Sequence, residues 1–263
     1  MIPQWLALPT VMAMAFGAAV VRGATGFAQA LVFLPLAVFF YSPLVMVPVV
    51  LILSSEAAVM FLAKYGRGQN WVAVRQTELL RPSSLFVLVL SMTVGATLLG
   101  AFPEDRVRQL VGLVVFLAAL LYLAADFSFL KDGRPGRENR SHRRLPVARI
   151  VTCGASGVAQ GFAGIGGPPV VLYLLWRGAG PETFIVTFSA LFMLADVIRS
   201  VDYGLRGYWT TEVFRLALLL TPATILGFLL GDWLRRRFLP PEIFRRVILA
   251  VLVLVALRLM TRF

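Results

Sequence analysis

The stretch QGFAGIGGPP at residues 160–169 decides the fold, because it places four glycines and two adjacent prolines between two apolar runs. A related stretch, RGATGFAQ at residues 22–29, interrupts the first apolar run of the chain. A helix broken at membrane depth leaves backbone N–H groups unpaired, which is tolerated only around a ligand or a water-filled cavity. Glycine lets a ligand approach these groups, and the positive end of the following half-helix favours an anion. The two stretches therefore predict interrupted membrane segments around an anion site.

The composition argues against a water-soluble protein. Of the 263 residues, 59% are hydrophobic and 14% are charged, and the mean hydropathy is +0.83. Ordinary globular chains carry about 25% charged residues, so this chain has too few ionic groups to cover its surface in water. The single Cys153 and the single His142 argue against a disulfide framework and against a Cys- or His-rich metal site. We therefore expect a membrane protein without a metal or a cofactor.

Apolar runs that can enter a bilayer come in two sets of five. A bilayer core about 30 Å thick needs roughly 20 apolar residues for each crossing helix. The first set covers residues 5–21, 27–41, 44–63, 85–102 and 107–125, and the second covers 145–159, 168–176, 184–198, 214–234 and 243–260. The opening residues lack the basic start of a secretory signal, so we interpret them as part of the first membrane helix. The expected fold class is all-α, with eight to ten membrane-inserted segments.

The two sets are related by a shift of 138 positions, which indicates an internal repeat. The shift aligns glycines, a Tyr-Gly pair, a tryptophan and a Pro-Glu pair, namely Gly23/Gly161, Gly26/Gly164, Tyr65/Tyr203, Gly66/Gly204, Trp71/Trp209, Pro103/Pro241 and Glu104/Glu242. Chance agreement at one shift is easy for Ala, Leu and Val but hard for these residue types. We therefore divide the chain into an N-terminal repeat (1–130), a basic cytoplasmic loop (131–149) and a C-terminal repeat (150–263).

The net charge of +12 is concentrated in residues 64–81, 131–149 and 232–246. Cytoplasmic loops retain Lys and Arg, whereas a nucleic-acid surface would interleave its basic residues with aromatic ones. The counterparts of 64–81 and 232–246 under the 138-residue shift have balanced charge, so equivalent loops lie on opposite sides of the membrane. This pattern predicts inverted repeats with both termini outside. Each half then crosses either five times, or three times with a re-entrant hairpin formed by its first two segments.

Helix packing is an alternative role for some of the glycines. Gly154, Gly157, Gly161 and Gly164 are spaced by three or four residues, which is the small-residue pattern that lets membrane helices approach closely. A packing stripe needs neither adjacent glycines nor a proline pair. We therefore assign Gly154 to packing and the residues from Gly161 onward to a ligand site.

The paired glycine-rich stretches at the start of two homologous halves resemble the sulfite exporter TauE/SafE family of integral membrane permeases. The resemblance rests on GATGF at residues 23–27 and GFAGIGGPP at residues 161–169, and it extends over the whole chain in length, halves and basic central loop. The first stretch departs from the second, because it has Ala28, Gln29, Ala30 and Leu31 where the second has a double glycine and a proline pair. The resemblance implies export of small sulfur-containing anions, such as sulfite or sulfonates, across the bacterial inner membrane. Substrates differ within the family, so the particular anion does not carry over.

The candidate substrate site collects the glycines of both breaks and the polar residues beside them. It comprises Arg22, Gly23, Thr25, Gly26, Gln29, Gln160, Gly161, Gly164, Gly166, Gly167 and Pro168. We expect backbone N–H groups of residues 161–167 to hold an oxyanion, with Gln160, Thr25 and Gln29 as side-chain donors. Arg22 either pairs with the oxyanion by two parallel hydrogen bonds or ends the first helix and extends to the membrane interface.

Three further charged residues lie within apolar runs, where ionisable groups are functional candidates by default. Glu56 lies near the middle of residues 44–63 and is a candidate carrier of a co-transported proton, because burial of a lone carboxylate favours its neutral form. The alternative is a Glu56 that a neighbouring helix neutralises. Asp196 and Arg199 are three residues apart on one helical face, which favours a structural ion pair, and Asp196 is the second candidate for proton coupling.

These patterns indicate a secondary transporter for a small anion rather than an enzyme. The sequence contains no ATP-binding loop of the Walker type, so ion gradients or the membrane potential must supply the energy. A potential that is negative inside favours export of a monovalent anion by about 2.3 kcal/mol per 100 mV. An anion channel is the nearest alternative, because it also uses helix ends that face a polar path. A membrane-embedded enzyme and a structural subunit are the others. The expected partners are the anion, the lipid bilayer and protons, with no nucleic acid.

Overall fold

The computed structural model describes residues 4–66, 69–107, 109–114, 116–117, 145–177, 179 and 181–237. No strand occurs in these ranges. The helices are α1 (Gln4–Thr25), α2 (Gln29–Ala37), α3 (Pro43–Tyr65), α4 (Gln69–Gln76), α5 (Pro82–Ala101), α7 (Leu145–Ala163), α8 (Gly167–Trp176), α9 (Pro181–Leu205) and α10 (Thr211–Arg237), and residues 104–107 and 109–114 are also helical. The predicted segment 243–260, most of the basic loop and residues 118–125 lie outside the described residues.

Within the described residues, five helices are long and apolar enough to cross a membrane. Their spans are Leu8–Thr25 in α1, Pro43–Tyr65 in α3, Pro82–Ala101 in α5, Glu182–Leu205 in α9 and Thr211–Arg237 in α10. Large apolar side chains are exposed along α5, α9 and α10, and Phe86, Val201 and Leu218 are each more than half exposed. Water-soluble monomers rarely expose such extended apolar surface, whereas lipid tails cover it. The chain is therefore an all-α, multi-pass membrane protein.

Local sequence sets where the helices begin. Ser42 caps α3, since its Oγ accepts a hydrogen bond from the Leu44 N–H at 3.3 Å, and Pro43 occupies the first turn. Pro82 occupies the first turn of α5 in the same way. Apolar runs alone placed the start of α3 one residue too late and that of α5 three residues too late, because hydropathy does not register caps. The apolar runs did not predict α4, half of whose eight residues are polar.

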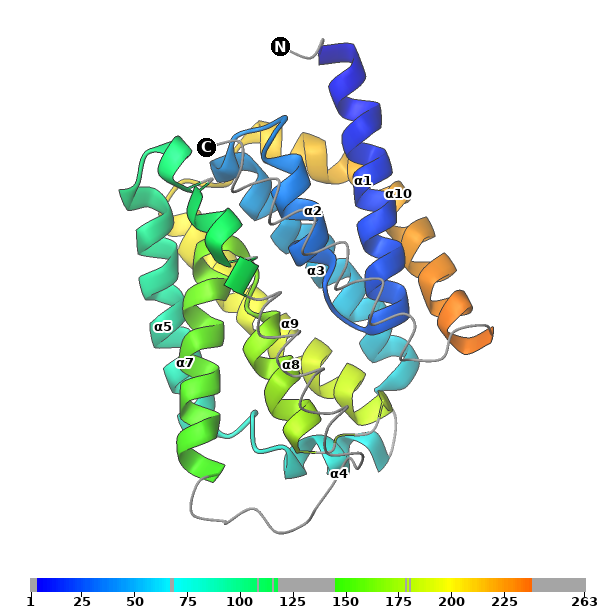
Figure 1. Cartoon of the computed structure of the whole chain (residues 1–263), viewed down its shortest axis with the longest axis vertical. Coiled ribbons are helices and arrows are strands. Elements are labelled where there is room, and N and C mark those ends of the chain that lie inside the picture. Colours follow the sequence, from blue (N-terminus) through cyan, green and yellow to red (C-terminus); the bar gives the residue numbers. More distant parts are fainter. Residues whose placement is uncertain are drawn as a thin grey trace.

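Besides the eight-residue α4, two apolar helices are too short to cross a bilayer. α2 has nine residues and α8 has ten, so each is about 15 Å long, roughly half of the hydrocarbon core. α2 runs back along α1, and α8 runs back along α7, so each pair forms a hairpin (Figure 1). Gly26 and Gly164 at the two tips have positive φ angles of 86° and 70°. α1 and α7 begin at opposite ends of the molecule, so the tips approach each other in its interior (Figure 1).

Extensive helix contacts surround the hairpins. α1 packs against α10, α5 packs against α7, and α3 packs against α9. A Cβ on Gly23 would collide with the Phe228 carbonyl oxygen, and one on Gly161 would collide with the Met92 carbonyl oxygen. Gly23 and Gly161, both included in the predicted substrate site, therefore lie where two helix backbones touch.

The packing prediction for Gly154 is wrong. A Cβ on Gly154 would meet only Val87 Cγ1, at an ordinary distance of 3.7 Å. A Cβ on Gly157 would instead collide with Ser91 Oγ and with the Leu88 carbonyl oxygen. Gly157 therefore allows the close contact of α7 with α5, whereas position 154 does not require glycine.

Candidate functional site

A small cavity of about 30 Å³ lies where the two hairpin tips meet. It is lined by residues of the tips, of α3 and of α9, namely Arg22, Ala28, Gln29, Ala30, Leu31, Ser54, Gln160, Gly164, Ile165, Gly167, Phe188 and Phe192. A cavity needs about 10–15 Å³ of open volume to accommodate one water molecule. This cavity is therefore large enough for about two or three water molecules or a small ion.

Arg22, in the last turn of α1, is the charged side chain that lines the cavity. The residue is 4% exposed, and its Nη2 donates a hydrogen bond to the Ser54 carbonyl oxygen at 3.1 Å. Its Nε has no hydrogen-bond partner within the described part of the chain. Of the five buried charged residues that the structure describes, Arg22 is the one without an ion pair, since Arg149, Asp196, Arg199 and Asp232 all have one. A buried cation that has no ion-pair partner is costly, so the cavity is suited to an anion.

The N-terminus of α2 also faces the cavity. Ala28 is its N-cap residue, has a φ of 72° and provides no side-chain cap, and residues 28–31 all line the cavity. The first N–H groups of a helix have no partner inside the helix and favour negative charge. Gln29 is 2% exposed, and its Oε1 has no hydrogen-bond partner among the described residues. The cavity thus combines a cation, an amide side chain and a helix N-terminus.

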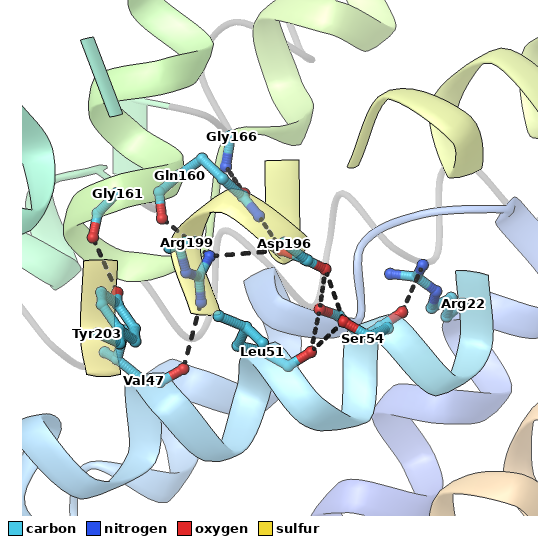
Figure 2. Close-up of polar contacts among 11 residues, drawn as sticks. Arg22, Val47, Leu51, Ser54, Gln160, Gly161, Gly166, Asp196, Arg199 and Tyr203 are labelled. Carbon is cyan, nitrogen blue, oxygen red and sulfur yellow. Dashed lines mark hydrogen bonds and ion pairs between the residues drawn. The ribbon is translucent and has the colours of Figure 1, made fainter. Parts of the chain in front are cut away.

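The Asp196 carboxylate lies behind the cavity wall, between Ser54 and Gln160 (Figure 2). It accepts hydrogen bonds from Ser54 Oγ at 3.1 Å, Ser55 Oγ at 3.2 Å and Gln160 Nε2 at 3.1 Å. Arg199 Nη1 is 3.8 Å from Asp196 Oδ1. Ser54 therefore contacts both Arg22, through its carbonyl oxygen, and Asp196, through its hydroxyl group.

Arg199 links α9 to α7 and to α3. Its Nη1 donates to the Gln160 carbonyl oxygen at 3.0 Å, and its Nη2 donates to the Val47 carbonyl oxygen at 3.4 Å. The Tyr203 hydroxyl group, one turn further along α9, donates to the Gly161 carbonyl oxygen at 3.0 Å (Figure 2). These bonds satisfy carbonyl groups at the end of α7, so they hold the second hairpin tip against α9.

The second tip is held from within by Gln160 and Ser156. The Gly166 N–H donates to Gln160 Oε1 at 2.9 Å, and Ser156 Oγ donates to the Gly166 carbonyl oxygen at 2.6 Å. The N–H group of Gly166, predicted to hold the oxyanion, is therefore already paired. Gly164 and Gly167 line the cavity, whereas Gly166 and Pro168 do not.

The remaining predicted residues lie near the cavity without lining it. Thr25 Oγ1 is 2.7 Å from the Val21 carbonyl oxygen and 2.9 Å from that of Phe27, and it accepts a bond from the Phe27 N–H. A Cβ on Gly26 would lie 2.8 Å from Ile185 Cγ1. Of the predicted substrate residues, the structure brings Arg22, Gln29, Gln160, Gly164 and Gly167 together around one space.

Glu56, the first candidate for proton coupling, faces α10 instead of the cavity. Its Oε1 is 2.6 Å from Thr221 Oγ1, and its Oε2 is 3.4 Å from Thr224 Oγ1. Within the ranges that the structure covers, no cationic side chain pairs with it. Two hydroxyl groups thus surround a carboxylate inside a membrane span.

The sequence analysis missed Ser54 as a site residue and missed the aromatic wall of the cavity. Ser54 and the adjacent Ser55 are small hydroxyl side chains in an apolar run, and only their place next to Glu56 distinguished them. The rings of Phe188 and Phe192 are tilted by 38° with their centroids 4.4 Å apart. A spacing of four residues in a helix is also the pattern of ordinary core residues. No sequence signal distinguishes a phenylalanine that lines the cavity from one in the ordinary core.

An ion cluster at the far end of α3 and α10 also went unpredicted. The buried Asp232 pairs with Lys64, with Arg235 at 2.7 Å and with Arg236 at 3.3 Å, and it accepts a hydrogen bond from the Tyr65 hydroxyl group at 2.7 Å. Among the residues that the structure covers, no group of His, Cys, Asp and Glu is arranged to hold a metal ion.

Comparison with known proteins identifies the family. A family model described as sulfite exporter TauE/SafE matches residues 11–259. No curated protein and no solved structure matches the chain. The match covers both hairpin tips and every residue that lines the cavity. The chain therefore belongs to the sulfite exporter TauE/SafE family of membrane transporters.

Proposed function

We propose that this protein is a secondary transporter that exports a small sulfur-containing or related anion, such as sulfite or a sulfonate, across the bacterial inner membrane. The family supports transport of sulfur-related anions. The observation that carries the proposal is the buried guanidinium group of Arg22, which faces a small cavity without an ion-pair partner among the described residues. A bound anion would supply the missing counter-charge.

In this proposal Arg22, Gln29 and the N-terminus of α2 bind the anion directly. Gln160, Gly164 and Gly167 shape the opposite wall, and a Cβ on Gly167 would come within 3.2 Å of the Phe188 ring. The glycines Gly23, Gly26, Gly161 and Gly166, together with Thr25 and Pro168, act indirectly by allowing the two tips to meet. The first hairpin, which lacks the double glycine, thereby contributes most of the binding groups.

We also propose that the two halves, residues 1–130 and 150–263, are inverted repeats. Two glycines that contact equivalent residues of α1 and α7 support this arrangement, and the glycines themselves are 136 positions apart. A Cβ on Gly231 would collide with the Val20 carbonyl oxygen, and one on Gly95 would collide with that of Val158, which is 138 positions after Val20. α1 and α7 begin at opposite ends of the molecule (Figure 1). With the positive-inside rule, the arrangement has residues 131–149 in the cytoplasm and both termini outside.

For coupling, we propose Glu56 as the proton carrier ahead of Asp196. Asp196 accepts three hydrogen bonds and has Arg199 beside it, and these contacts favour its charged form. Glu56 has only the hydroxyl groups of Thr221 and Thr224 near it among the described residues. A carboxylate without a cation at membrane depth is the better candidate for reversible protonation.

Transport by purified protein in liposomes tests the proposed function. The lumen is loaded with unlabelled sulfite, and uptake of labelled sulfite is followed while total sulfite is higher inside than outside. With the membrane potential held at zero, a transporter that exchanges anions should transiently concentrate the label inside above its outside concentration, and so should Arg206→Gln, a variant of an arginine that pairs with Asp202 on α9. Label that enters only until its inside and outside concentrations are equal would indicate a channel, and an absence of flux for sulfite, methanesulfonate and acetate would refute anion transport.

The coupling proposal has a separate test. Glu56→Gln keeps the side-chain length and removes the ionisable group, so transport should continue but lose its dependence on an imposed pH gradient. The matched control is Glu104→Gln, a change of an exposed glutamate that contacts Ser42. If Glu56→Gln responds to the pH gradient as the parent protein does, Glu56 is not the proton carrier and Asp196 becomes the candidate.

A further inference from the structure

We infer that the cavity selects singly charged anions over doubly charged ones, and that Asp196 is the residue that sets this selectivity. The inference rests on the proposed anion site, and it names the charge class of the substrate. It follows from the charges that surround the cavity and from the small number of free donors in its wall.

The first step is the charge balance. Arg22 lines the cavity, and the Asp196 carboxylate and the Arg199 guanidinium lie directly behind its wall. A Cβ on the lining residue Gly164 would be 3.3 Å from Arg199 Nη1 and Nη2. Two cations and one carboxylate leave one positive charge, because Glu56 faces α10 on another side of α3. A singly charged anion neutralises this site, whereas a doubly charged one leaves a net negative charge in a membrane interior.

The second step is the position of Asp196 relative to a bound anion. Ser54 and Gln160 both line the cavity, and both donate hydrogen bonds to Asp196 on their far side. Only one layer of side chains therefore separates a bound anion from the carboxylate. At such short range in a poorly solvated interior, each added unit of negative charge is repelled by Asp196 as well as attracted by Arg22.

The third step is the supply of hydrogen-bond donors. Both ends of the Gln160 amide are occupied, one by the Gly166 N–H and one by Asp196. Ser54 Oγ has a single proton, which the Leu51 carbonyl oxygen and Asp196 already compete for. The other lining side chains include Leu31, Ile165, Phe188 and Phe192, which donate nothing. The donors that remain are Arg22, the Gln29 amide and the first N–H groups of α2, and they replace the hydration of a monoanion more completely than that of a dianion.

Binding of two matched anions to the purified protein tests the inference. Methanesulfonate and sulfate are similar in size, but methanesulfonate carries one negative charge and sulfate carries two. Calorimetric titration should give methanesulfonate an affinity at least about tenfold higher than that of sulfate. Equal or tighter binding of sulfate would overturn the inference and leave the proposed anion site intact. Binding of neither anion, nor of sulfite, would instead contradict the proposed function.

A pH series with sulfite provides a second measurement on the unaltered protein. Lowering the pH converts sulfite, a dianion, into singly charged bisulfite, while methanesulfonate keeps its charge. The apparent affinity for total sulfite should rise in proportion to the bisulfite fraction, and the affinity for methanesulfonate at the same pH values should stay within about twofold. An affinity for total sulfite that is independent of pH, or that falls as bisulfite forms, would contradict selection of monoanions.

The variant Asp196→Asn tests whether Asp196 sets the preference for singly charged anions. The substitution removes the negative charge while keeping an amide that can accept a bond from Ser54. The ratio of sulfate affinity to methanesulfonate affinity should rise about tenfold in this variant, whereas Asp202→Asn, a control six residues away on α9, should leave it unchanged. An unchanged ratio in a folded Asp196→Asn protein would remove Asp196 from the account. If that variant does not fold, the pH series still decides the charge selectivity.

Discussion

Arg22 illustrates how a functional residue reduces stability. A buried cation without a counter-charge costs free energy of folding, and the cost falls when an anion binds. We predict that Arg22→Gln, which places at position 22 the residue found at position 160, raises the free energy of unfolding of the ligand-free protein by about 1–3 kcal/mol. Thermal unfolding in detergent measures this.

The same unfolding experiment with added methanesulfonate completes the test. The parent protein should gain stability with increasing ligand, whereas Arg22→Gln should not. A ligand-free variant that is less stable than its parent would mean that the Arg22 side chain stabilises the folded protein even when no anion is bound.

Gly26 tests the geometry of the first hairpin tip. Its φ is 86°, and a Cβ would lie 2.8 Å from Ile185 Cγ1, so Gly26→Ala combines backbone strain with a steric clash. We expect a loss of about 2–3 kcal/mol in the free energy of unfolding. The control is Gly17→Ala, because position 17 lies within α1 and nothing is within 4 Å of its added Cβ. This control should be neutral or stabilising, and a similar loss in both variants would contradict the described tip.

At the scale of single residues, the sequence predicted the cation and the amide of the site but not their surroundings. Arg22 and Gln29 stand beside a glycine break in an apolar run, so their position alone drew attention to them. The Gly166 N–H donates to Gln160, and the Ser54 hydroxyl group donates to Asp196. Both hydrogen bonds depend on how separate helices meet. Such contacts have no local sequence pattern.

Among the helices, the contacts of α1 with α10 and of α5 with α7 carry a stability prediction. A Cβ on Gly231 or Gly95 would collide with a backbone carbonyl oxygen of the facing helix, which cannot move aside as a flexible side chain can. Gly231→Ala and Gly95→Ala should therefore each lower the free energy of unfolding by about 2 kcal/mol or more. Gly154→Ala, where the nearest atom is Val87 Cγ1, is the control on α7 and should cost less than about 0.5 kcal/mol. Equal effects at all three positions would argue against these helix contacts.

Hydropathy located most of the helices, because lipid requires long apolar segments and glycine or proline interrupts them. It could not place the helix ends, since α7 continues to Ala163, beyond the predicted end at residue 159. The polar end of α7 is stabilised by Arg199 and Tyr203, which bond its last carbonyl groups from another helix. A contact of this kind lies outside any window of local sequence.

For the whole molecule, the inverted arrangement predicts which loops face the cytoplasm. A membrane-impermeant maleimide should label Gly207→Cys from outside intact cells, since a Cβ at position 207 has nothing within 4 Å, and Gly133→Cys only after the membrane is opened. The native Cys153 is buried and should give little background. Protection of Gly207→Cys together with external labelling of Gly133→Cys would overturn the topology.

The central claim is that a small anion neutralises Arg22 in the cavity between the two hairpin tips. Calorimetric titration of the purified protein with methanesulfonate, compared between the parent, Arg22→Gln and Arg206→Gln, tests it most directly. The account predicts saturable binding to the parent and to Arg206→Gln, in which a partly exposed ion pair with Asp202 is lost. For Arg22→Gln it predicts a loss of about tenfold or more in affinity, because a charged hydrogen-bond donor is removed from a buried site. Binding to a folded Arg22→Gln protein with the affinity of the parent would contradict the account.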